Sequence, residues 1–144
     1  MTFDAQLKST LQGIHQRPTE VEALAIIDVA RLAAAADRRS DVAETAVLLS
    51  VTKIVCEMAG LDDIPQLAPH ITPARVGEIG EELVPQGARE LAFAAAFLVM
   101  IQDLELTSEE KNLASALGEA LVIEAPRAAE LAQAMEALVR AAKA

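Results

Sequence analysis

The chain has 144 residues, 53% of them hydrophobic, and a formal net charge of −10. With 12 basic against 22 acidic residues and only three aromatic side chains, it lacks the basic surface and stacking residues of nucleic-acid-binding proteins. A mean hydropathy of +0.30 excludes intrinsic disorder. Alanine, the best helix former, accounts for 30 residues, whereas Tyr and Trp, which favour strands, are absent. We therefore expect an all-α fold.

Capping signals divide the chain into seven predicted helices. Three sequences are typical of capping boxes, in which the first residue caps a helix and a Glu three residues later bonds back: Thr19-x-x-Glu22, Asp41-x-x-Glu44 and Thr107-x-x-Glu110. Pro73 suits a first helical position, and Gly60 suits the position just past a helix end. The predicted helices, in chain order, cover residues 3–13, 20–36, 42–59, 73–84, 87–102, 108–123 and 126–143.

The apolar patterns predict which helices lie at the centre. Residues 20–36 and 87–102 are apolar on nearly every side, as helices buried on every side are. Residues 126–143 instead carry one apolar stripe, which is typical of a covering helix. No linker divides the chain, so residues 1–144 are predicted to form a single seven-helix bundle domain.

An offset of 66 residues relates two parts of the chain. Asp37 then falls on Asp103, and Glu44 falls on Glu110. Each copy comprises a buried helix, an acidic turn and a capped amphipathic helix. The repeat predicts two pseudo-symmetric helical hairpins whose buried helices meet at the centre.

This repeated pattern resembles the TerB-like tellurite-resistance family. Members typically have Ala-Asp-Gly-Glu, an apolar residue and then Ser/Thr-x-x-Glu, and the matching stretch here is Gln102-Asp103-Leu104-Glu105-Leu106-Thr107-Ser108-Glu109-Glu110. Leu104 stands where the family usually has glycine, and the first copy carries Arg38 and Arg39. The resemblance covers about residues 20–143. It implies an all-helical bundle of two related halves, without known catalysis, that acts in stress or metal-resistance complexes.

The resemblance also implies a divalent-cation site at the acidic turns. Its ligands would be Asp37, Glu44, Asp103, Glu105 and Glu110. Carboxylate oxygens are the ligands that Ca²⁺ and Mg²⁺ prefer, so one of these ions is the expected ligand, and no other cofactor is expected. The alternative is that Thr107 and Glu110 only cap a helix while Glu109 complements its dipole.

The charge surplus lies in two segments. Residues 103–124 contain six acids and one base, and residues 57–90 contain seven acids and two bases, so each segment has a net charge of −5. Such segments either keep a protein soluble or attract a partner with a basic surface. The alternative function is therefore a protein–protein interaction scaffold that has no metal site. The sequence also allows the chain to assemble into homo-oligomers.

The remaining polar residues indicate structural roles. His15 and His70 are expected at the surface, Asp28 should pair with Arg31, and Cys56 should be packed as a small apolar group. No nucleophile–base pair or phosphate-binding loop is evident, so we expect no enzyme activity. The N-terminus lacks a signal peptide, and the longest apolar run has 11 residues where a membrane span needs about 20, so a cytoplasmic protein is expected.

Overall fold

The computed structural model describes residues 2–36 and 42–143, with the side chains of residues 36 and 42–44 also outside that description. Within these ranges the chain forms seven helices and no strand, which confirms the all-α prediction. The helices are α1 (Phe3–Ile14), α2 (Glu20–Ala36), α3 (Val42–Met58), α4 (Pro73–Glu82), α5 (Gln86–Met100), α6 (Ser108–Ala120) and α7 (Ala125–Lys143).

Side-chain caps fix the first turns of several helices. At α6 the Thr107 hydroxyl accepts the backbone N–H of Glu110 at 3.1 Å, and the Glu110 carboxylate accepts the N–H of Thr107 at 3.0 Å. Thr19 and Glu22 make the same reciprocal pair at α2, both at 3.1 Å. Two of the predicted capping boxes are thus confirmed. The third, Asp41 with Glu44, lies outside the described residues.

Two helices end in Schellman motifs, in which the second residue past the cap bonds back over a full turn. After α3, Gly60 adopts a φ of 80° and the N–H of Leu61 donates to Cys56 O at 2.9 Å. After α6, Val122 adopts a φ of 56° and the N–H of Ile123 donates to Gly118 O at 2.9 Å. Glycine tolerates this left-handed conformation, whereas a β-branched residue is strained in it.

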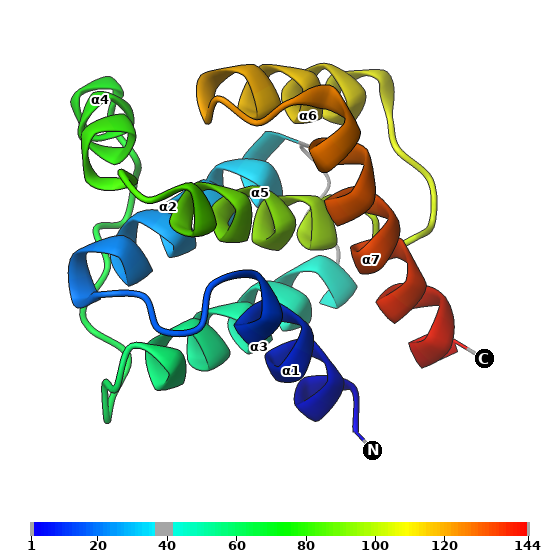
Figure 1. The fold of residues 1–144 in the computed structure, drawn as a ribbon, viewed down its shortest axis with the longest axis horizontal. Coiled ribbons are helices and arrows are strands. Elements are labelled where there is room, and N and C mark those ends of the chain that lie inside the picture. The colour runs from blue at the N-terminus through cyan, green and yellow to red at the C-terminus, as the bar shows by residue number, and fades with distance from the viewer. Residues whose placement is uncertain (1, 37–41, 144) are drawn as a thin grey trace.

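Helices α2 and α5 form the centre of the bundle, as predicted. They pack against each other more extensively than any other pair of helices. Every residue of α5 from Leu91 to Met100 is buried. Figure 1 shows α2 and α5 crossing at the middle of the molecule, with α6 above them, α3 and α1 below and α7 at one side. The buried apolar side chains form one continuous cluster with members from α1, α2, α3, α4, α5 and α7. Helix α6 packs against this cluster through the half-buried Leu113, Ala114 and Leu117.

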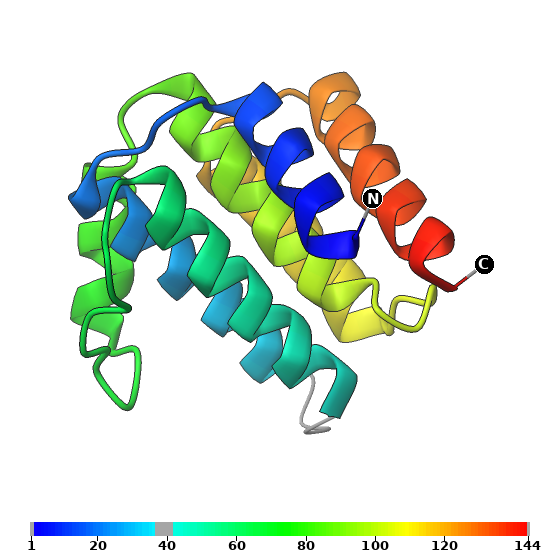
Figure 2. The same ribbon diagram turned by 90° about the horizontal axis from the view of Figure 1, so that it is seen from below.

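The two predicted hairpins differ in how closely they pack. Helix α3 lies along α2, whereas α6 makes far fewer contacts with α5 (Figure 2). Helix α7 takes the place beside α5 that the repeat would give to α6. The pseudo-twofold relation therefore stays a prediction. Across the described ranges, none of the helices combines the length and apolar character that crossing a bilayer requires.

Candidate functional site

The predicted site lies in the turn between α5 and α6. Asp103 and Glu105 are exposed there, and Asp103 Oδ1 accepts the backbone N–H of Glu105 at 3.0 Å. Leu104 between them has a φ of 62°, and its N–H donates to Ile101 O at 2.9 Å. This left-handed conformation is the one that favours glycine. The chain thus forms a glycine-type turn at Leu104, the position that the resemblance to TerB-like proteins aligns with a glycine.

Glu110 has a different role from the two turn residues. It is only 2% exposed, and its carboxylate is held by the N–H of Thr107 in the capping box. Among the residues that the structure describes, no three His, Cys, Asp or Glu side chains gather where they could share a metal ion. Asp37 lies outside the described residues, as does the side chain of Glu44. The five-residue cation site therefore stays a prediction.

The two acidic segments differ in how their charges are compensated. In residues 103–124 every acid except Glu110 is exposed, and none makes an ion pair with a described residue; these acids are Asp103, Glu105, Glu109, Glu119 and Glu124. In residues 57–90, by contrast, four of the seven acids pair with a base, namely Glu57, Glu78, Glu82 and Glu90. Counting ion pairs with described residues, residues 103–124 thus leave five exposed acids unpaired, whereas residues 57–90 leave three.

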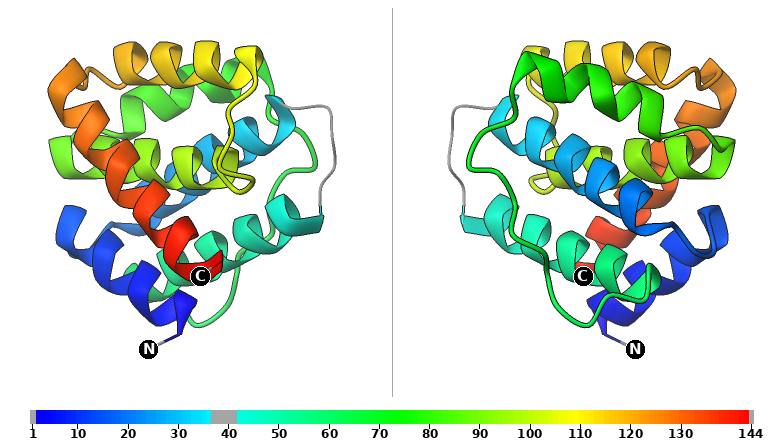
Figure 3. Two further views of the ribbon diagram at one scale, coloured as in Figure 1. Left: turned by 90° about the vertical axis from the view of Figure 1, so that its right-hand side faces the viewer. Right: turned by 90° about the vertical axis from the view of Figure 1, so that its left-hand side faces the viewer.

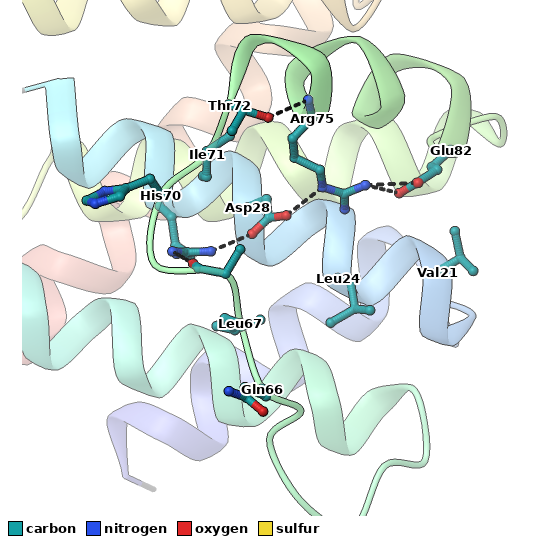
Figure 4. A pocket seen from close by; sticks show the side chains of 12 residues that line it. Val21, Leu24, Asp28, Gln66, Leu67, His70, Ile71, Thr72, Arg75 and Glu82 are labelled. Atoms are coloured by element: carbon teal, nitrogen blue, oxygen red, sulfur yellow. Dashed lines mark hydrogen bonds and ion pairs between the residues drawn. The ribbon is translucent and has the colours of Figure 1, made fainter.

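A second candidate is a cleft of about 350 Å³ between α2, α4 and the preceding loop (Figure 4). The Asp28 carboxylate lies in it between two guanidinium groups. Arg31 Nη1 donates to one oxygen at 2.9 Å, which confirms the predicted pair, and Arg75 Nε donates to the other at 2.8 Å. Arg75 also donates to both oxygens of Glu82 at 2.9 Å, and Arg31 donates to Ala68 O.

These contacts engage the carboxylates and guanidinium groups of the cleft with one another. Burial lowers the pKa of Arg75, but its hydrogen bonds to Glu82 and Asp28 outweigh burial and hold the pKa above its ordinary value. Both carboxylates are occupied by guanidinium groups, so neither is placed to act as a general base. The ion pair of Asp28 with Arg75 instead fastens α4 to α2, and the hydrogen bond from Arg31 to Ala68 O fastens the loop before α4. The pair of Asp28 with Arg75 had no sequence signal, because 47 residues separate them.

The two histidines differ from each other. His70 is exposed, as predicted. The side chain of His15 is only 20% exposed, and its Nε2 lies 3.1 Å from Glu22 Oε1, the oxygen that also accepts the N–H of Thr19. His15 thus joins the end of α1 to the first turn of α2 rather than lying free at the surface. A Cβ at Gly87 would come within 2.7 Å of His15 Nδ1, so the start of α5 also packs closely on this ring.

Cys56 is packed as predicted. Its side chain is buried on α3, and burial raises the pKa of the thiol above its ordinary value. The neutral thiol is therefore favoured, which is the opposite of what a reactive cysteine requires.

Comparisons of the chain with protein families, characterised proteins and solved structures gave no match. Any assignment of function therefore depends on the chemistry of the residues themselves.

Proposed function

We propose that this chain is a non-catalytic, TerB-like helical module that binds a partner protein with a basic surface through residues 103–124. The observation that carries the proposal is the set of five exposed acids in this segment, none of them in an ion pair with a described residue. Charges without an internal partner are free to steer and orient an oppositely charged surface. The glycine-type turn at Leu104 supports the TerB-like part of the proposal, and with it a role in a stress or tellurite-resistance complex.

A lysine-rich peptide without apolar residues is a suitable probe of this function. We expect its addition to shift the backbone amide resonances of residues 103–124 in a ¹⁵N-labelled sample, and these shifts should shrink as salt is raised. Residues 57–90 have the same net charge of −5 and serve as the internal control, because part of their charge is paired. Equal shifts in both segments would mean that only net charge acts, and would overturn the proposal.

A divalent cation is the competing ligand, since Asp103 and Glu105 are both exposed in one turn. Binding to the native state at about a hundredfold excess over Kd adds about 2.7 kcal/mol. For a domain of this size the melting temperature should then rise by about 5–10 °C. Sodium chloride at matched ionic strength is the control for screening. If Ca²⁺, Mg²⁺, Mn²⁺ and Zn²⁺ all fail to exceed that control, the module acts without a metal.

Two substitutions separate metal binding from helix capping. Asp103→Asn should abolish any divalent-specific rise and leave α6 intact, because Thr107 and Glu110 still cap it. Thr107→Ala should lower the free energy of unfolding by about 1 kcal/mol with or without metal. An unchanged divalent effect in Asp103→Asn would remove this turn from the metal site.

A further inference from the structure

A groove separates α6 from α7 although the two helices follow each other in the chain. Both helices pack on α5 and hardly touch one another, and they diverge from their junction at residues 121–124 (Figure 3). The groove between them has a volume of about 400 Å³, within the range of pockets that bind ligands. Its lining includes the buried pair Phe93 and Phe97 of α5, whose stacked rings have centroids 6.2 Å apart.

Small side chains line most of the two walls of the groove, which also include Glu119 and Ile123. Ala114, Ser115 and Gly118 line it from α6, and Ala128, Ala129 and Ala132 line it from α7. Within each wall the residues recur at helical spacing, so each helix turns one small-residue face to the groove. Small residues allow a third helix to approach closely, because the distance between packed helices depends on the side chains at the contact. An apolar groove between two helices is a common binding site for an amphipathic helix.

The net negative charge of residues 103–124, which include the α6 wall of the groove, favours an occupant with a basic surface. Glu119 is the charged residue that lines the groove, and the other exposed acids of residues 103–124 lie on α6 and in the turns at its two ends. Lys111, three positions before Ala114 on α6, is the one base of this segment, whose net charge is −5. The nearby Arg127 of α7 is compensated by Glu90 at 2.8 Å and by Glu130 at 3.3 Å. An acidic helix, or another molecule of this chain with its net charge of −10, would be repelled.

We propose that the groove between α6 and α7 is the docking site for a basic amphipathic α-helix of the partner protein. Apolar side chains from successive turns of that helix fill the groove over Phe93 and Phe97. Lysine and arginine side chains at its flanks pair with the acids of residues 103–124. This inference rests on the proposed function and adds to it the location of the interface and the form of the partner.

The chain allows a direct optical test, because it contains no Trp and no Tyr. The probe is a synthetic lysine–leucine amphipathic peptide of about 18 residues, long enough to form a helix, with one Trp on its apolar face. We expect its Trp emission to shift to shorter wavelength as the ring enters the groove. A peptide of the same composition in scrambled order, which has no apolar face, should bind at least about tenfold more weakly.

Two alanine-to-leucine variants locate the binding site. Ala129 lines the groove, whereas Ala137 lies two turns further along α7 and does not line it, and both are exposed. Filling the groove with Ala129→Leu should weaken binding at least about tenfold, and the matched Ala137→Leu should change it by less than about twofold. Because both sites are exposed, neither variant should alter the melting temperature by more than a few degrees, which thermal unfolding checks.

The outcomes separate this inference from the proposed function. The groove would be ruled out as the docking site if the two leucine variants weakened peptide binding equally, or if the scrambled peptide bound as tightly as the amphipathic one. Residues 103–124 would still stand as a partner-binding surface. Failure of the lysine-rich peptide to select residues 103–124, combined with groove-dependent binding of the amphipathic peptide, would overturn the proposed function alone. If neither peptide binds, both are overturned.

Discussion

Asp28 of α2 and Arg75 of α4, which are 47 positions apart in the sequence, form an ion pair at 2.8 Å. The same carboxylate accepts a hydrogen bond from Arg31, so a single acidic side chain lies between two guanidinium groups that are each about one-fifth exposed. Through this pair and the bond from Arg31 to Ala68 O, the loop before α4 and α4 itself are fastened to the central helix. The strength of that attachment can be measured.

Asp28→Ala should lower the free energy of unfolding by about 2–4 kcal/mol, because it leaves two half-buried guanidinium groups without that carboxylate. Urea denaturation followed by circular dichroism measures the loss. The matched control is Glu57→Ala, which removes an exposed pair with Lys8 at 3.3 Å and should cost less than about 1 kcal/mol. Similar losses in the two variants would show that the cleft adds nothing beyond a surface ion pair.

Phe97→Ala tests the centre of the core. The side chain is 7% exposed and stacks on Phe93, so truncation creates a cavity and should cost about 3–5 kcal/mol. Urea denaturation again provides the measurement. Leu49→Ala, at a side chain 57% exposed, is the control and should stay within about 0.5–1 kcal/mol. A loss below about 1 kcal/mol for Phe97→Ala would mean that α5 is not central.

Cys56 should react slowly with a thiol reagent in the native protein and rapidly in urea, because the thiol is buried on α3. Burial raises its pKa in the folded state, so the unfolded thiol ionises at a lower pH than the folded one. The stability that this group contributes is complete below the ordinary thiol pKa and is lost as the pH rises toward the folded value. Native labelling at a rate near that of the unfolded chain would contradict the buried assignment.

The left-handed residues after α3 and α6 offer a reciprocal pair of substitutions. Val122→Gly should raise the free energy of unfolding by about 1 kcal/mol, because it relieves a strained conformation and Val122, at 68% exposed, loses little packing. Gly60→Ala should lower it by about 1 kcal/mol for the same reason in reverse. Changes of equal sign in the two variants would show that backbone conformation does not decide either effect.

Local signals in the sequence predicted most of the helices, and long-range contacts account for what was missed. The capping pairs of Thr19 and Thr107 involve residues three positions apart, so their spacing alone indicates where α2 and α6 begin. The pairing of Asp28 with Arg75 depends on how α4 docks, and no local pattern encodes it. The contact of His15 with Glu22 likewise depends on the path of the chain between α1 and α2.

The sequence predicted which acidic residues make up the candidate site, but it did not predict the role of each one. The sequence located the acids of residues 103–124 and indicated Glu110 as a cap through its spacing from Thr107, yet the same residue was also a predicted metal ligand together with Asp103 and Glu105, which are exposed. Their carboxylates are chemically alike, and only burial and hydrogen bonding separate the roles. The groove between α6 and α7 gave no signal of its own, because alanines that line a groove and alanines that face a neighbouring helix have the same spacing.

Helices α1 and α7 pack against each other, and Figure 2 shows the ends of the described chain emerging on the same side of the molecule. We therefore expect the arrangement of the helices to tolerate a change in the order in which they are joined. A short linker from α7 to α1, with a new opening at the exposed pair Asp62 and Asp63, would give a circular permutant that begins near α4 and ends after α3. In that permutant both new ends lie in the loop beside the Asp28 cleft, and a reporter domain fused there would leave the face of α6 and α7 unobstructed.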